Sequence, residues 1–204
     1  MNALSLTRSL PTEARPRALT LLNRQLAHAI DLRLRAKQAL WNIRRSELEA
    51  HQTLCAQVLH ATRIAAEALA KRASDLGGVA EATVQGVGRN TRLSVHPAGL
   101  TRAPDHLWAF CGALVQYTAS AREAVTAADL NGDYDTGDLF ALISRAADTL
   151  LWEVGEYLSA IQDASTPVAS NRVHSPVTHS AATGAENANP FDKPILTNHQ
   201  PLDS

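Results

Sequence analysis

Two pairs of side chains in one predicted helix, over residues 47–76, are spaced for joint chemistry. His51 and Cys55 stand four residues apart, as do Glu67 and Lys71, and side chains at that spacing lie on one face of a helix. An imidazole beside a thiolate would be half of a site for a soft metal ion, whereas a histidine packed beside a buried thiol needs no metal. Glu67 and Lys71 carry opposite charges and are predicted to form an ion pair.

Three aspartates, Asp133, Asp135 and Asp138, gather where one predicted helix ends and the next begins. Acidic residues at alternate positions are found in calcium loops, but the glutamate that would complete such a loop is missing, because Phe140 stands at its position counted from Asp129. Carboxylates are also favoured at the start of a helix by the positive end of its dipole. The sequence therefore predicts a helix start here rather than a calcium site.

Four long stretches of the chain show apolar residues at spacings of three, four and seven, the pattern of amphipathic helices. The predicted helices cover residues 18–43, 47–76 and 105–130, and a fourth runs from the aspartate cluster to Ile161. Gly77 is expected to end the second helix, since glycine tolerates the left-handed conformation found there. Residues 79–104, interrupted by Gly and Pro, form a long crossover with at most a short helix. Such a crossover between the second and third long helices indicates a ferritin-like four-helix bundle.

The length of 204 residues predicts one domain with tails. Residues 1–17 are expected to be a flexible leader, 18–163 the bundle, and 164–204 a disordered tail, because the tail is polar and lacks a face that could be buried. No apolar run approaches the roughly 20 residues that cross a membrane, and residues 1–10 lack the apolar centre of a secretory signal. We therefore expect a cytoplasmic protein without membrane contact.

Charge argues against strong binding to nucleic acid. The formal net charge is -1, and the leader offers only Arg8, Arg15 and Arg17 as a weak basic arm. DNA binding is expected to be weak or absent. The sequence also contains no Ser-His-Asp arrangement, glycine-rich phosphate loop or dinucleotide fingerprint, so it gives no sign of hydrolase or nucleotide chemistry.

Two blocks of residues resemble the Dps family, small ferritin-like proteins that form hollow cages. The second block is Ala70–Gln85, which is similar to the end of the family's second helix. The first lies in the predicted first helix and consists of Leu22-Asn23-Arg24-Gln25, Ile30-Asp31-Leu32, Lys37-Gln38-Ala39 and Trp41-Asn42. The resemblance extends from Leu19 to Ile161. It implies an all-α, ferritin-like four-helix bundle that assembles with copies of itself into a dodecameric shell.

The same resemblance implies where iron would be oxidised. In the Dps family, carboxylates and imidazoles from two subunits bind iron at a two-fold interface. Those ligand positions fall on Leu40, Gln52, Ala56, Glu67 and Lys71. Of these, only Glu67 keeps a metal-ligand type, and Lys71 brings a cation that repels a metal ion. We expect a degenerate ferroxidase centre without a tightly bound metal, in which the Glu67–Lys71 pair balances charge locally.

His51 is the other metal candidate, beside Glu67. It lies one residue before the position of a family ligand, and a helix turns by about 100° per residue, so its side chain should point away from that site. The aspartate segment resembles the family's acidic stretch at three-fold pores, which steers cations into the cage. Asp138 is the best match there, with Asp135 and Asp133 beside it, and pore lining and helix capping can coexist.

The function implied by the resemblance is that of a mini-ferritin cage protein, linked to iron sequestration and stress protection, that holds iron in its cage but lacks ferroxidase activity of its own. Three alternatives stay open. The shell can serve a structural or interaction role, it can co-assemble with an active paralogue, or it can protect DNA without oxidising iron.

Overall fold

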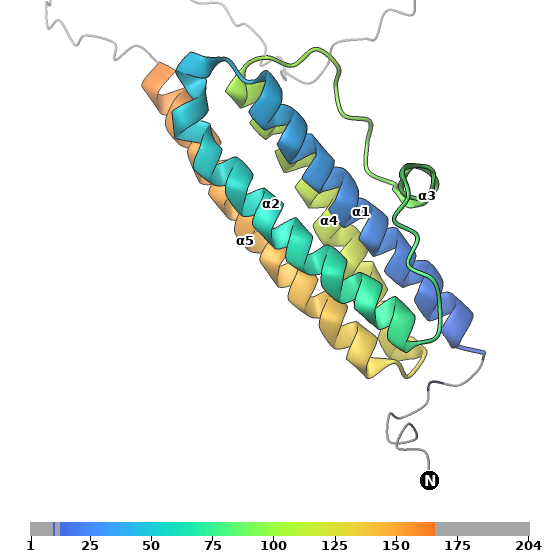
Figure 1. Ribbon diagram of the computed structural model, residues 1–204. Coiled ribbons are helices and arrows are strands. Elements are labelled where there is room, and N and C mark those ends of the chain that lie inside the picture. Colours follow the sequence, from blue (N-terminus) through green and yellow to red (C-terminus); the bar gives the residue numbers. More distant parts are fainter. Residues whose placement is uncertain (1–9, 11–12, 166–204) are drawn as a thin grey trace, which may run out of the picture. The chain divides into compact units, whose positions relative to one another are not determined.

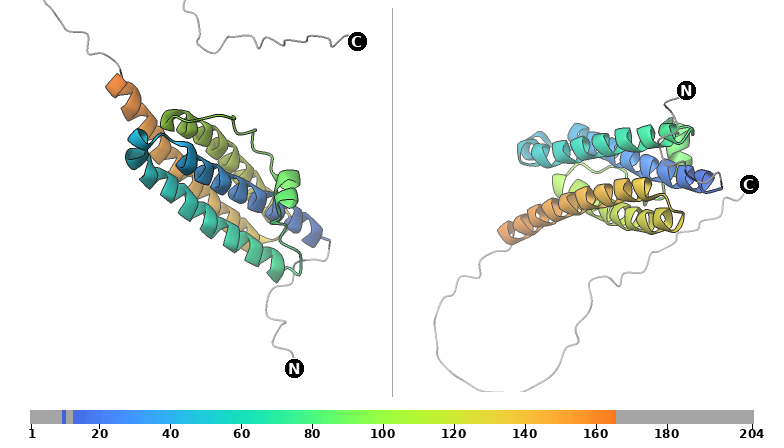
Figure 2. Two further views of the ribbon diagram at one scale, coloured as in Figure 1. Left: turned by 45° about the horizontal axis from the view of Figure 1, so that its top comes forward. Right: turned by 90° about the horizontal axis from the view of Figure 1, so that it is seen from below.

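The computed structural model describes residues 10 and 13–165, and every regular element in that part of the chain is helical. Four long helices form the bundle, and α3 (Val84–Asn90) lies in the crossover (Figure 1). The long helices are α1 (Arg15–Asn42), α2 (Arg45–Asp75), α4 (Ala103–Leu130) and α5 (Tyr134–Ser165). Helix α1 packs along α2 and α4 along α5, and the two pairs meet through α1–α4 and α2–α5 contacts (Figure 2). The predicted bundle with a long crossover before its third long helix is confirmed.

The ends of the helices differ by a few residues from those predicted. Helix α1 begins at Arg15 rather than Ala18, because Pro16 fits the first turn of a helix, where its missing N–H leaves no bond unmade. Arg15 and Arg17, expected in the leader, are therefore exposed residues of that first turn. Arg8 and the predicted tail from residue 166 lie outside the described residues. None of the helices among the described residues is long and apolar enough to cross a membrane.

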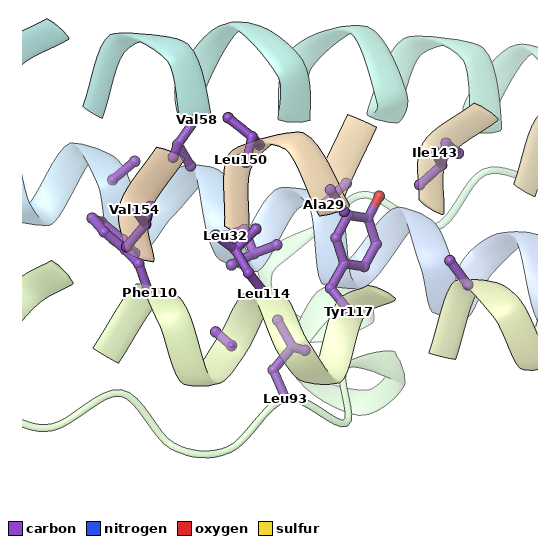
Figure 3. Packing of buried hydrophobic residues seen from close by; sticks show 14 of the residues in the cluster. Ala29, Leu32, Val58, Leu93, Phe110, Leu114, Tyr117, Ile143, Leu150 and Val154 are labelled. Atoms are coloured by element: carbon purple, nitrogen blue, oxygen red, sulfur yellow. The ribbon is translucent and has the colours of Figure 1, made fainter. Parts of the chain in front are cut away.

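The core is one apolar cluster to which all four long helices contribute (Figure 3). Leu32 of α1, Val58 of α2, Phe110 of α4 and Val154 of α5 are each completely buried. Burying a side chain of this size stabilises a fold by roughly 1.5–3 kcal/mol. The periodic apolar positions read from the sequence thus face one another across the bundle axis.

Gly77 ends α2, as predicted. Its φ of 72° is left-handed, and the amides of Gly77 and Gly78 donate to the carbonyls of Ser74 and Ala73 at 2.8 and 2.9 Å. Gly78 lies so close to Leu19 of α1 that a Cβ added there would overlap the leucine side chain. The pair therefore both stops the helix and lets the chain pass tightly beside α1 into the crossover.

Polar side chains on one edge of α1 hold the start and middle of the crossover. The Asn23 amide donates to the Val79 carbonyl at 3.0 Å, and its oxygen accepts the Glu81 N–H at 2.8 Å. Further along, Nε2 of His28 accepts the N–H of Arg92 at 3.0 Å. These bonds satisfy crossover backbone groups that belong to no helix.

A buried ion pair completes this attachment. The Arg35 guanidinium donates to both oxygens of Asp31 at 2.8 Å, with side-chain exposures of 6% and 19%. Arg35 also donates to the Ser94 carbonyl at 2.7 Å, and the Thr91 hydroxyl donates to Asp31 at 3.0 Å. The two charges are thus hydrogen-bonded to each other and to the crossover, which offsets the cost of burying them.

His28 should make the stability of the subunit depend on pH. Burial, with a contribution from the charge of Arg24, lowers the pKa of His28 from 6.5 to about 4. In the unfolded chain the imidazole takes up a proton near pH 6.5, whereas the folded protein resists this down to about pH 4. Because the unfolded state binds more protons in that window, stability is lost as the pH falls through it, by about 3 kcal/mol in all.

The measurement is the free energy of unfolding from pH 7.5 to 4 for wild type and H28Q, whose amide cannot titrate. We expect a shallower decline for H28Q, whatever its absolute stability. H60Q, at an exposed histidine of α2, is the matched control and should follow wild type. Identical slopes for wild type and H28Q would contradict the prediction.

Candidate functional site

The positions that the resemblance assigns to an iron centre lie along an outer stripe of α2 and at the end of α1. Gln52, Ala56, Glu67 and Lys71 are all exposed, and their spacing keeps them on one side of the helix. Leu40 on α1 is half-buried. We call these five positions the α2 stripe with Leu40.

Chemically, the stripe offers a single carboxylate, that of Glu67. Within the described residues of one subunit, no three His, Cys, Asp or Glu side chains come together in a way that could hold a metal ion. Trp41, next to Leu40, exposes 76% of its surface, so the end of α1 presents a large apolar side chain beside the stripe. The surface here combines apolar and amide groups with one acid and one base.

Lys71 forms its ion pair with Asp75 and not with Glu67. Its Nζ lies 2.8 and 3.0 Å from the two oxygens of Asp75. Both carboxylates stand four residues from the lysine, one on each side, and the flexible lysine stem reaches either, so the spacing could not distinguish them. The predicted Glu67–Lys71 pair is wrong. The pair that forms is well exposed, and such pairs contribute at most about 1 kcal/mol.

His51 is a core residue of the subunit. It is buried, and its ring meets Tyr157 of α5 edge-on, with centroids 4.8 Å apart and planes at 70°. Cys55 is also buried and makes no disulfide, and burial raises the pKa of its thiol to about 11. Since a thiolate is the form that binds metal, this environment favours the packing interpretation of the His51–Cys55 pair over half a metal site.

Of the three aspartates, Asp133 is buried in an ion pair. Arg72 of α2 donates to its Oδ1 at 2.7 Å, and only 2% of the Asp133 side chain is exposed. The same oxygen accepts the Thr136 N–H at 3.4 Å, at the start of α5, and Thr136 in turn accepts a bond from Arg72 at 2.9 Å. The helix start expected here is confirmed, and the burial removes Asp133 from the residues that could line a pore.

Asp135 and Asp138, unlike Asp133, are exposed to solvent. Asp138 is exposed on the first turns of α5. Asp135 exposes 79% of its side chain, although one of its oxygens comes within 3.8 Å of Arg72. Both carboxylates can face a neighbouring subunit or a passing cation, so pore lining stays a prediction for these two residues.

Sequence reasoning missed Arg72 as the residue that joins the end of α2 to the α4–α5 turn. Its partner is 61 residues away, and no local periodicity links positions so far apart. The sequence did hold one hint: the second block of resemblance contains a single arginine, Arg72, and the α4–α5 turn is acidic, so the two could have been expected to pair. The polar edge of α1, with Asn23, Asp31 and Arg35, was missed for the same reason.

Comparison with known proteins agrees with this architecture. The ferritin-like domain matches residues 19–164. A DNA protection during starvation protein from Agrobacterium fabrum is 32% identical over 143 residues, which make up 70% of this chain and 88% of that protein. The crystal structure of an archaeal Dps homologue from Halobacterium salinarum shares 19% identity over 79% of this chain and 87% of its own, with a TM-score of 0.68.

Two further solved structures are similar. DpsC from Streptomyces coelicolor has a TM-score of 0.70 at 22% identity, covering 84% of this chain and 92% of its own. Dps from Microbacterium arborescens, in a high iron form, has a TM-score of 0.67 at 24% identity, covering 74% and 98%. The bundle and the extent of these matches define a ferritin-like protein. Within that class, the chain belongs to the Dps family.

The Arg72–Asp133 pair should matter more to stability than any exposed pair. D133N removes the charge that holds a partly buried guanidinium but keeps a side-chain oxygen that can accept the Thr136 N–H, so we expect a loss of about 3 kcal/mol in the free energy of unfolding from the broken ion pair. D135N, at the exposed neighbour that also approaches Arg72, is the control and should cost less than about 1 kcal/mol. Chemical unfolding followed by circular dichroism compares them, and equal losses would show that Asp133 has no special role.

Proposed function

We propose that this protein is a Dps-type mini-ferritin that forms a cage, sequesters iron and protects the cell under stress, without ferroxidase activity of its own. Membership of the Dps family supports the cage and the link to iron. The composition of the α2 stripe with Leu40 supports the loss of oxidation, and it is the observation that carries this part of the proposal.

Iron oxidation at the family position requires several hard, anionic or imidazole ligands around one metal ion. Here Leu40 and Ala56 supply hydrocarbon, Gln52 supplies a neutral amide, and Lys71 supplies a cation. Glu67 by itself would bind Fe(II) weakly. Iron in the cage would therefore arrive already oxidised or be oxidised by another component, with Asp135 and Asp138 as the candidates that attract cations to the entrance.

Exposed apolar side chains support assembly. Leu34 and Trp41, seven residues apart on one face of α1, each expose more than half of their surface in the isolated subunit. Large apolar groups left exposed together commonly mark an interface. The family's two-fold contact would bury the end of α1 beside α2, which is where Trp41 stands.

Co-assembly with an active paralogue is the second candidate. A centre built from two subunits receives ligands from both, so a partner with a full ligand set could still use Glu67 of this chain. DNA protection is a weaker alternative, because the near-zero charge leaves few groups to neutralise phosphates, and Arg15 and Arg17 are the exposed leader-side cations among the described residues.

The assembly is tested by light scattering coupled to size exclusion. We expect wild type to elute as a dodecamer and W41E to shift toward smaller species, because a carboxylate would be buried in the two-fold contact without a partner. Circular dichroism verifies that W41E keeps its helices. A stable wild-type monomer would contradict the cage and the pore role of Asp138 together.

The loss of oxidation is tested by stopped-flow absorbance after Fe(II) is mixed with peroxide or oxygen. We expect wild type to match buffer and the fourfold variant L40H/Q52H/A56D/K71E, with Glu67 kept, to oxidise Fe(II) at a saturable rate. Any one of the four changes alone should do little, because ligands of one metal ion act together.

A matched control carries the same side chains one position further along α2. T53H and Q57D, also at exposed positions, replace Q52H and A56D in that variant, and a turn of about 100° directs each new side chain away from the direction of the residue that it replaces in the site, Gln52 or Ala56. This control should stay inactive. Rapid oxidation by wild type would contradict the proposal, and an inactive fourfold variant that still assembles would mean that the positions are assigned to the wrong residues.

A further inference from the structure

A pocket of about 260 Å³ opens between α2 and α5, and none of its lining residues belongs to the α2 stripe with Leu40. Ile64, Ala65 and Ala68 line it from α2, and Leu142 and Ile143 line it from α5. The lining is almost entirely hydrocarbon. Ile64 and Leu142 are half exposed or more, so the pocket has an open mouth on the surface of the subunit.

Tyr117 of α4 lies behind this pocket and contributes to its lining. Figure 3 shows its ring crossing the core, with the hydroxyl directed away from α4. Only 3% of the residue is exposed, and the hydroxyl makes no hydrogen bond with the described part of the chain. Burial raises the pKa of Tyr117 well above its usual range, so the group remains a neutral hydroxyl. A buried hydroxyl without a partner is unfavourable and calls for one.

The other side chains that line the pocket favour a neutral ligand over a charged one. The Thr62 hydroxyl already donates to the Val58 carbonyl at 2.6 Å, and His60 is exposed. No Lys, Arg, Asp or Glu lines the pocket, so a charged ligand would lose its hydration without gaining a counter-charge. An apolar cavity of about 150 Å³ is enough to hold benzene, and this pocket is larger.

We propose that the pocket binds a small, neutral, mainly apolar molecule of the size of an alkylphenol, whose single hydroxyl or carbonyl pairs with the Tyr117 hydroxyl. A second copy of the chain laid across the mouth would cover Ile64 and Leu142. It would leave Tyr117 unpartnered, because a helix surface is too broad to enter the pocket. The buried hydroxyl therefore favours a small molecule over a protein partner.

The test uses the assembled full-length protein and two probes that differ in one hydroxyl, 4-ethylphenol and ethylbenzene, titrated by calorimetry. Both should bind saturably to wild type. Y117F should weaken 4-ethylphenol by about threefold to tenfold, the worth of one hydrogen bond, and leave ethylbenzene unchanged. A structural effect of Y117F on the core would instead weaken both probes alike, and that result would overturn the role of the hydroxyl.

A variant that fills the pocket with a larger side chain tests whether the probes bind there. A146L enlarges an exposed residue of the pocket lining and should abolish binding of both probes, while A160L, an exposed alanine of α5 outside the lining, should bind as wild type does. A68L, from the opposite wall, repeats the test if A146L fails to assemble. Absence of saturable binding to wild type, as would follow if a second copy covers the mouth, overturns the proposal, as does undiminished binding by both filled variants.

Discussion

The crossover between α2 and α4 must run along the bundle with few backbone hydrogen bonds of its own, and the fold depends on how α1 supplies them. It starts at Gly78, which is in contact with α1, and it ends beside the α1–α2 turn, where the Arg44 N–H donates to the Thr101 carbonyl at 3.1 Å. Between these points, Asn23, His28 and the Asp31–Arg35 pair hold it at intervals. Helix α1 is therefore apolar toward α2 and α4 and polar along the edge that meets the crossover.

This division explains how much of the fold could be read from the sequence. Apolar spacing gave the long helices to within a few residues, because each buries one face and the period of a helix is fixed. The crossover was visible from its glycines and prolines. Its attachment was not visible, since the bond between His28 and the Arg92 backbone joins residues 64 positions apart, and nothing local in the sequence relates them.

The candidate site divides in the same way. The resemblance to the Dps family assigned the positions of the α2 stripe, and the structure places Gln52, Ala56, Glu67 and Lys71 on one exposed side of α2. The ion-pair partner of Lys71 could not be predicted, because a carboxylate stands four residues away in each direction, and the lysine pairs with Asp75 rather than Glu67. Burial could not be read either: Asp133 and Asp138 look alike in the sequence, yet one is enclosed by Arg72 and the other is exposed.

The exposure of the α2 stripe has a consequence for how such a chain can change over generations. Side chains that are absent from the core can be exchanged without refolding the protein, so folding does not restrict which residues occupy these positions. A bundle of this kind can lose a set of metal ligands, keep its shape, and later accept another set on the same surface. The scaffold and the chemistry it carries can therefore evolve separately, with selection on one leaving the other free to drift.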